Sequence, residues 1–167
     1  MKRSGSGCVG VEGLADRPYD RFGSLLGGKS MPSVFSRIVS GELPSAKVYE
    51  DDETLAFMDI NPASRGHTLV ICKEEYPDIF ATPPHLVAAV ARTAQKVALA
   101  LRDALNIDGL NIVQNNGAAA GQVVFHYHVH LIPRWNGDRV LRPWTPHPAE
   151  PSELRAIAEQ IRAALKD

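Results

Sequence analysis

Three of the six histidines in this 167-residue chain occur at alternate positions, His126, His128 and His130, here called the histidine row. Side chains at positions i, i+2 and i+4 of a β-strand lie on one face, about 6.6 Å from one to the next. Such a window would arise by chance in about 1% of chains with this number of histidines. We therefore expect the three imidazoles to project together into a pocket or groove.

Four interpretations of the histidine row are open on this pattern. The first interpretation is a polar strand face without a chemical role. The second is a metal site, because His-x-His on a strand is a common zinc half-site. Alternatively, one neutral imidazole is a nucleophile in phosphoryl chemistry while its neighbours donate hydrogen bonds to phosphate oxygens. The fourth interpretation is a nucleotide pocket without turnover, serving as a sensor or interaction module. A cupin-type metal site would need a nearby glutamate, and residues 131–134 contain none.

Strands are the main elements expected to position the row. The row belongs to a predicted strand over residues 123–133, and two strands joined by an acidic turn are predicted over 47–60. A central strand is predicted over 67–73, and another strand over 109–117 that runs into a turn. The second face of the row's own strand is expected to supply core residues, namely Phe125, Tyr127, Val129 and Leu131.

Three helices complete the prediction. Ser33 is expected to N-cap a short helix beginning at Val34, and residues 152–166 predict an amphipathic helix. Thr82 is expected to cap the longest helix, with Pro83 at its first position. Apolar residues recur in that helix at Leu86, Val90, Val97, Leu101 and Leu105. Because strands and helices do not alternate strictly, we predict an α+β fold with an antiparallel sheet.

Composition predicts one globular domain. Hydrophobic residues make up 44% of the chain and charged residues 22%, and the formal net charge of -1 argues against a broad nucleic-acid surface. Residues 1–30 predict a flexible extension, and residues 31–167 a single domain that includes a C-terminal arm and helix. No apolar run approaches the roughly 20 residues of a membrane span. With Cys8 and Cys72 expected as free thiols, we predict a cytoplasmic protein.

The sequence resembles the histidine triad family, whose signature is His-x-His-x-His followed by two apolar residues. Residues 126–132 satisfy that signature at every position. Residues 36–73 resemble the family's N-terminal half, and residues 115–122 resemble the loop before the triad. The resemblance implies an antiparallel sheet with one long helix, and a sheet that continues across a homodimer.

The resemblance also implies a reaction. His128, the middle histidine, would attack the α-phosphorus of a nucleotide and form a nucleotidyl-histidine that water cleaves. His130 would contact phosphate, His126 would help to fix the site, and His67 matches a further histidine near the triad. The implied function is a purine nucleotide hydrolase or phosphoramidase for AMP-type substrates, without a cofactor. Nucleotide transferases of the superfamily tend to carry glutamine at the third position, so His130 favours hydrolysis. The alternative is a non-catalytic nucleotide sensor.

Further residues match the family's nucleotide site. Asp59 matches the acidic residue that accepts hydrogen bonds from the ribose hydroxyls, and Asn115 matches an amide on the phosphate side. Gln122 lies in the loop that leads to the triad. The apolar slot for the base is matched by Val34, Phe35, Ile38, Phe57 and Ile60.

Two departures from the family bear on metal and rate. Some relatives carry Cys-x-x-Cys near the start and bind structural zinc, whereas this chain has Ser33 and Ser36. Glu75 stands where a further metal-binding histidine is expected, so we predict no metal. Several relatives have Ser or Thr after the Gly-Gln pair, where a hydroxyl can donate to the leaving group. Val123 cannot do this, so substrate choice and rate are expected to differ.

Overall fold

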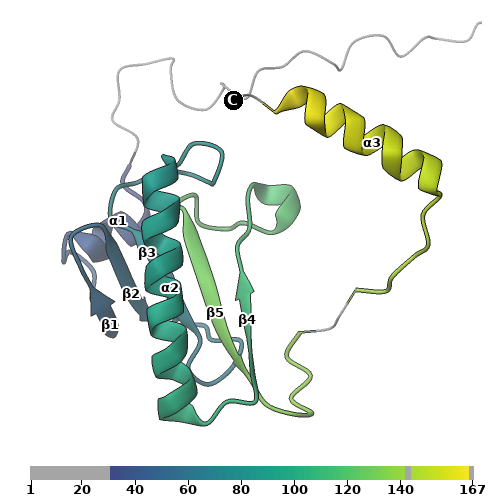
Figure 1. Cartoon of the computed structure of the whole chain (residues 1–167). Coiled ribbons are helices and arrows are strands. Elements are labelled where there is room, and N and C mark those ends of the chain that lie inside the picture. The colour runs from purple at the N-terminus through teal and green to yellow at the C-terminus, as the bar shows by residue number, and fades with distance from the viewer. Residues whose placement is uncertain (1–30, 142–143, 166–167) are drawn as a thin grey trace, which may run out of the picture.

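Five strands form one antiparallel sheet in the computed structural model, which describes residues 31–141 and 144–165. The extension predicted over residues 1–30 therefore lies outside the described residues. The strand order is β1-β2-β3-β5-β4, with β3 in the centre (Figure 1). The predicted α+β class is confirmed. The strands are β1 Lys47–Glu50, β2 Thr54–Met58, β3 Thr68–Cys72, β4 Gly109–Val113 and β5 His128–Arg134.

One face of the sheet is covered by the long helix α2, Pro84–Leu105 (Figure 1). The predicted apolar positions of α2 face the sheet, and all but the partly buried Leu105 are buried. Burying each such side chain contributes about 1.5–3 kcal/mol, so this interface is the principal core. It contains Ala56, Val70 and Cys72 from β2 and β3, and Val129 and Leu131 from β5.

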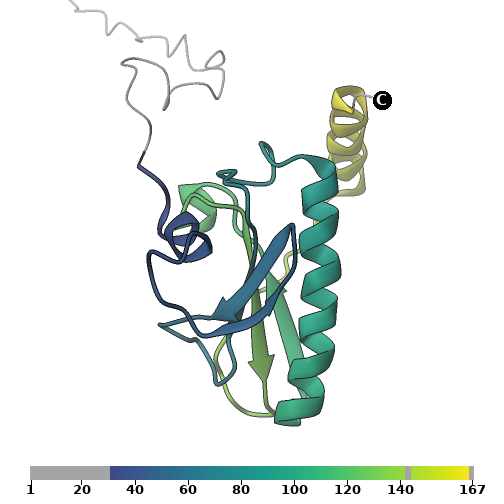
Figure 2. The same cartoon turned by 90° about the vertical axis from the view of Figure 1, so that its left-hand side faces the viewer.

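The short helix α1, Val34–Val39, lies on the opposite face of the sheet (Figure 2). The Ser36 backbone N–H donates to the Ser33 hydroxyl at 3.0 Å, which confirms Ser33 as the N-cap. Phe35 and Ile38 are the buried residues of α1. They form a second apolar cluster with Leu55, Phe57, Leu69 and Ile71 from β2 and β3.

Strand pairing decides which face of the sheet carries the histidines. His128 pairs with Ile71 and His130 pairs with Leu69, and both partners belong to the cluster under α1. Val129, between the two histidines, belongs to the core under α2. Because side chains alternate along a strand, His128 and His130 lie on the α1 side of the sheet.

The strand that carries the histidine row begins later than predicted. β5 starts at His128, because the His126 backbone N–H donates to the Val124 carbonyl at 2.9 Å and bends the preceding segment. Tyr127 is buried as predicted, but Phe125, which was predicted to be a core residue, is 51% exposed. An extended strand over the whole of residues 123–133 was therefore wrong, although the predicted face of the strand proper was right.

The start of α2 also differs from the prediction. Pro83 is the N-cap, and α2 begins at Pro84 without a side-chain hydrogen bond at the cap. Thr82 does not cap the helix, because its hydroxyl donates to the Asp78 carbonyl at 2.6 Å in the preceding turn. The bond that was expected at the helix end is thus used to close a turn.

The C-terminal helix α3, Pro151–Ala164, forms as predicted, after an arm that follows β5 (Figure 1). None of its residues is buried, and its apolar side is uncovered within the described chain, at Leu154, Ile157 and Ile161. Among the described residues, no helix combines the length and the apolar character needed to cross a membrane.

Candidate active site

The four histidines expected at the site come together on the α1 side of the sheet. His67, His126 and His128 are buried, and His130 is partly exposed. The ring centroids of His128 and His130 are 4.9 Å apart, and those of His67 and His130 are 5.1 Å apart. Phe35 of α1 lies edge-on to His128 at a centroid distance of 5.2 Å. Phe35 of α1 therefore covers His128, whereas the side chain of His130 is partly exposed to solvent.

Backbone carbonyls fix the protons of the first two histidines. His126 Nε2 lies 2.7 Å from the Cys72 carbonyl oxygen, and a carbonyl can only accept, so we assign the His126 hydrogen to Nε2. By the same argument, His128 Nδ1 donates to the His126 carbonyl oxygen. A neutral His128 then carries its lone pair on Nε2. That nitrogen is the one free to act as a nucleophile.

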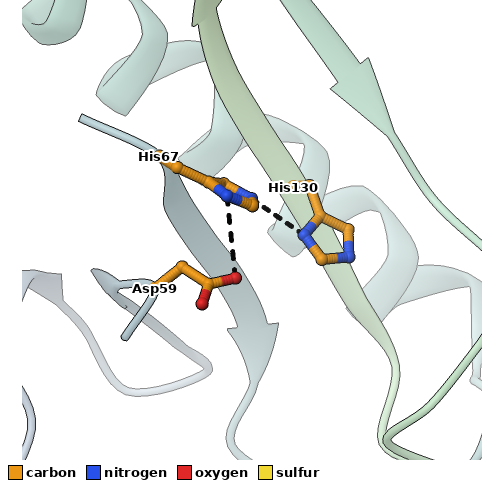
Figure 3. A group of neighbouring side chains, drawn as sticks. All are labelled: Asp59, His67 and His130. Atoms are coloured by element: carbon orange, nitrogen blue, oxygen red, sulfur yellow. Dashed lines mark hydrogen bonds and ion pairs between the residues drawn. The ribbon is translucent and has the colours of Figure 1, made fainter. Parts of the chain in front are cut away.

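The other end of the row has the opposite arrangement (Figure 3). The Ala63 backbone N–H donates to His67 Nδ1 at 3.1 Å, so the hydrogen of neutral His67 lies on Nε2. His67 Nε2 lies 3.0 Å from His130 Nδ1 and donates to it. His130 must then carry its own hydrogen on Nε2. This end of the row therefore offers an N–H donor where His128 offers a lone pair.

A glycine makes the position of His67 possible. Gly66 has φ = +85°, a conformation that favours glycine, and it directly precedes His67. A Cβ at this position would lie 2.4 Å from the Leu105 Cδ1 atom and 3.3 Å from the Pro133 Cγ atom. The chain therefore passes close to the end of α2 and to β5 before it enters β3.

Burial keeps the imidazoles neutral. It lowers the pKa of His67, His126 and His128 below the ordinary value, despite the nearby charge of Asp59 at His67 and His128. His130 has the strongest shift, because burial and then the neighbouring His128 and His67 lower its pKa to about 4. Near pH 7 the site thus holds an uncharged nucleophile and uncharged N–H donors.

Asp59 lies beside His67, and one of its carboxylate oxygens accepts a hydrogen bond within the turn that follows it. Asp59 Oδ1 accepts from the Asn61 backbone N–H at 2.8 Å, and Asp59 Oδ2 lies 3.7 Å from His67 Nδ1. The Asp59 side chain is partly exposed, and Oδ2 has the lone pairs to accept hydrogen bonds from a ligand's hydroxyls. The structure thus places this carboxylate next to the histidine row.

Asp59, His67 and His130 are close enough to suggest a metal site, with one ligand atom of each within 4.8 Å of the others (Figure 3). Their arrangement does not suit one. His67 stands between the other two, with Nδ1 accepting from the Ala63 backbone and Nε2 bonded to His130. The nitrogens face one another rather than a common point, as a metal ion would require.

The predicted apolar slot divides into buried and exposed residues. Phe35, Ile38 and Phe57 are buried in the cluster under α1, and Phe35 also contacts the His126 and His128 rings. Val34 is 41% exposed and Ile60 is 89% exposed, so they lie at the surface. The structure therefore brings Phe35 to the histidines and leaves Val34 and Ile60 outside the packed cluster.

The two amide side chains predicted for the site, Gln122 and Asn115, have different surroundings in the loop before β5. Gln122 is buried: its Oε1 accepts from the Gly117 N–H at 2.7 Å, and its Nε2 donates to the Pro77 and Val124 carbonyls. These bonds engage both amide hydrogens, so Gln122 shapes the loop instead of offering donors to a nucleotide. Within the described residues, the Asn115 side chain makes no hydrogen bond and is only partly buried.

Sequence reasoning missed a group of polar residues that contact His126. The Ser33 hydroxyl lies 2.9 Å from His126 Nδ1, and Ser36 and Ser33 both bond to Glu75. The Ser-x-x-Ser spacing at the start of α1 was the available signal. The sequence predicts Ser33 as a helix cap and the pair as replacements for two cysteines, and neither prediction includes a contact with His126.

Comparison with known proteins agrees with this geometry. The sequence profile of the HIT domain matches residues 40–137, which is more than half of the chain. The chain belongs to the HIT family. It is 36% identical to the adenosine 5'-monophosphoramidase hnt1 of Schizosaccharomyces pombe, over 81% of this chain and all of that protein. It is 48% identical to the adenylylsulfatase HINT3 of Arabidopsis thaliana, over 63% of this chain and 53% of that protein.

Solved structures show the same fold. The crystal structure of a HIT family member from Bacillus subtilis superposes with a TM-score of 0.78 at 38% identity, covering 82% of this chain and 99% of that one. A zinc-bound histidine triad family protein from Mycobacterium smegmatis superposes with a TM-score of 0.63 at 44% identity, covering 79% and 96% of the two chains.

The residues at the positions where the family resemblance implies zinc ligands do not suit a zinc ion. Hydroxyls are poor ligands beside thiolates, and the hydroxyls of Ser33 and Ser36 are bonded to His126 and Glu75. His126 has no free lone pair for a metal, because Nδ1 accepts from Ser33 and Nε2 donates to Cys72. Zinc binding at these residues would require the Ser33 bond to His126 Nδ1 and the Ser36 bond to Glu75 to break.

Proposed function

We propose that this protein is a purine nucleotide hydrolase of the phosphoramidase type, which acts at the α-phosphorus through a nucleotidyl-His128 intermediate. The observation that carries the proposal is the pairing of opposite tautomers on one strand face. His128 Nε2 has a free lone pair, and His130 Nε2, two residues along, carries a hydrogen. A nucleophile beside a fixed donor is what attack on a charged phosphoryl group requires.

In the first step, His128 Nε2 forms a bond to the α-phosphorus and the bond from phosphorus to the leaving amine breaks. The His128 ring becomes cationic, and its Nδ1–H remains on the His126 carbonyl, which stabilises that charge. His130 donates to a phosphate oxygen as charge redistributes. The departing amine takes a proton from water, because Val123, which is 85% exposed, has no hydroxyl to donate.

In the second step, water attacks the phosphorus and the nitrogen–phosphorus bond breaks. The products are AMP and neutral His128, and one proton returns to solvent, so that the net reaction consumes one water. Asp59 would accept hydrogen bonds from the ribose hydroxyls through Oδ2, and apolar residues of α1, of which Val34 is 41% exposed, would contact the base. Asn115, with its unbonded side-chain amide, would lie on the phosphate side.

The names of two relatives support the choice of substrate class. The monophosphoramidase hnt1 aligns over its whole length, and the adenylylsulfatase HINT3 also acts on an adenylyl group by its name. Both names describe a substrate in which AMP is joined to a leaving group. An AMP-linked amine is therefore the substrate proposed first.

The test is turnover of a panel of AMP-linked leaving groups, beginning with adenosine 5'-phosphoramidate and adenylylated lysine. We expect AMP release by the wild-type protein, unchanged by a chelator. His128→Ala should lose turnover and still bind AMP, whereas His85→Ala removes an exposed histidine from α2 and should be as active as wild type. Denaturing mass spectrometry at alkaline pH should detect an added nucleotidyl group on wild-type protein only. His128→Asn with wild-type turnover would overturn the nucleophile.

The same panel decides the alternative function. Micromolar AMP binding without turnover of any substrate would favour a nucleotide sensor or interaction module. His130 is partly exposed and would donate to a bound phosphate in either case.

We also propose that two copies of the chain pair through β4. This strand is an edge of the described sheet, and Ile112 on it is 59% exposed. The uncovered apolar side of α3 would gain cover in such an assembly. Analytical ultracentrifugation should show a dimer that Ile112→Lys dissociates. Val48→Lys, which alters the opposite edge strand β1, should leave the dimer intact; a wild-type monomer would overturn the proposal.

A further inference from the structure

A connected set of polar side chains joins the start of α1 to the loop after β3, and the proposed chemistry does not use it. The Ser33 backbone N–H donates to Glu75 Oε2 at 3.0 Å, and the Ser36 hydroxyl donates to the same carboxylate. Burial raises the pKa of Glu75, but the hydrogen bonds from Ser36 and Ser33 outweigh burial and leave the pKa below its usual value. Glu75 is therefore a permanent acceptor that anchors the first turn of α1.

The set ends on the most buried histidine. His126 is 0% exposed, and its Nδ1 lone pair faces the Ser33 hydroxyl at 2.9 Å. Because His126 Nε2 donates to the Cys72 carbonyl, Nδ1 can only accept, so the Ser33 hydroxyl is the donor. Both ring nitrogens of a fully buried imidazole are thereby satisfied, one by β3 and one by α1.

His126 connects these polar side chains to the nucleophile, because its ring bonds to Ser33 and its carbonyl accepts the hydrogen bond from His128. His126 lies in the bend before β5 rather than in the strand, so the sheet's hydrogen bonds do not hold it. Its backbone N–H bonds to the Val124 carbonyl, its ring bonds to Ser33 and Cys72, and its carbonyl receives the His128 Nδ1–H. Moving the ring would move that acceptor and release the His128 tautomer.

We propose that Ser33, Ser36 and Glu75 form a metal-free clasp whose task is to position His126, and through its carbonyl the lone pair of His128. The three are positioning residues, because none touches the reacting atoms. The catalytic consequence rests on the proposed function, but the clasp itself does not. Hydrogen bonds join the start of α1 to the loop after β3 and to His126.

The decisive variants separate the clasp from the helix cap. Ser33→Gly removes the hydroxyl, and glycine costs an N-cap only a few tenths of a kcal/mol. Ser33→Thr keeps the hydroxyl and should rescue. Ser40→Ala is the matched control, because this hydroxyl at the other end of α1 bonds only the Arg37 carbonyl. We expect Ser33→Gly to lower kcat about tenfold with KM unchanged. Glu75→Gln, at an exposed position, should lower kcat less.

The second readout does not depend on turnover. Long-range proton–nitrogen NMR of histidine-labelled protein should show His126 with its hydrogen on Nε2 and His128 with its hydrogen on Nδ1. In Ser33→Gly, His126 Nδ1 loses its nearer hydroxyl and keeps only Ser36 Oγ at 3.4 Å, whose hydrogen goes to Glu75. His126 should then protonate at higher pH, with the acid limb of the kcat profile following. Glu75, on the loop after β3, and His128, on β5, are the titratable groups that act on His126, and both remain in this variant.

Each outcome decides one proposal. Wild-type kcat and an unshifted His126 midpoint in Ser33→Gly would overturn the clasp. A shifted midpoint in a protein without turnover would support the clasp and overturn the proposed function. Turnover together with a hydrogen on His126 Nδ1 would support the function and overturn the clasp.

Discussion

His128 and His130 are the same residue type on the same face of the same strand, and the structure gives them opposite protons. His128 Nδ1 faces a carbonyl, which can only accept, and so Nε2 is left with a lone pair. His130 Nδ1 faces the His67 Nε2–H, and so its own Nε2 carries the hydrogen. The difference teaches that the partner of Nδ1, and not the imidazole itself, decides between nucleophile and donor.

The largest effects on kcat are expected when the His128 ring and the His130 ring are removed in separate variants. His128→Ala should lower kcat by about 10³-fold or more, because no other lone pair replaces Nε2. His130→Ala should lower kcat by about 10²-fold, the usual effect of losing one transition-state donor. Steady-state kinetics on adenosine 5'-phosphoramidate measure both. Equal losses would mean that the two rings do not have different tasks.

His67 supplies the hydrogen that sets the His130 tautomer, so variants of His67 test whether His130 acts as a donor. His67→Ala should lower kcat about tenfold, as the loss of an orienting partner does. His67→Gln keeps an N–H that can face His130 Nδ1 and should retain more of the activity. If the alanine and glutamine variants are equally active, His67 does not act through this hydrogen bond.

Acid should distinguish the two ends by stability. The pKa of His130 is lowered from 6.5 to about 4, so between these values the unfolded chain binds more protons than the folded protein. The free energy of unfolding should therefore fall as pH falls from 6.5 toward 4. Denaturant unfolding across this range measures the effect. His130→Gln should weaken the dependence, and an unchanged dependence in this variant would contradict the prediction.

The smallest effect is expected from adding a donor. Val123→Ser places a hydroxyl in the loop before β5, at a position that is 85% exposed in the wild type. This hydroxyl would protonate the departing amine in place of water and raise kcat a few-fold for poor leaving groups. Substrates with good leaving groups should show no gain. A uniform gain across all leaving groups would argue against proton donation.

The sequence predicted the face that carries His128 and His130 because the period of two along a strand is a local property. It did not predict the bend at His126, where the backbone N–H bonds to the Val124 carbonyl and the ring bonds to Cys72, 54 residues away in sequence. Phe125 was misplaced for the same reason, since the strand pattern continues through residues that the bend removes from the strand. Long-range partners decided where the pattern stopped applying.

The two long helices give a second case. Both α2 and α3 have an apolar side, and both were predicted from that periodicity. α2 buries Val90 and Val97 against the sheet, whereas Ile157 and Ile161 of α3 are exposed. An apolar stripe predicts that one side of a helix packs against another surface, but it does not identify that surface. The role of Glu75 was hidden in a similar way, since its partners lie about 40 residues earlier.

The acceptors that set the protons of His126 and His128 are main-chain oxygens, those of Cys72 and His126. The thiol of Cys72 faces the Glu74 carbonyl and takes no part in this. Residue 72 is therefore free to vary in size and polarity, within the limits of the core, while the nucleophile keeps its orientation. Transplanting the nucleophile into another sheet would therefore require the strand register and the bend at His126, together with a hydroxyl placed as Ser33 is to hold the His126 ring.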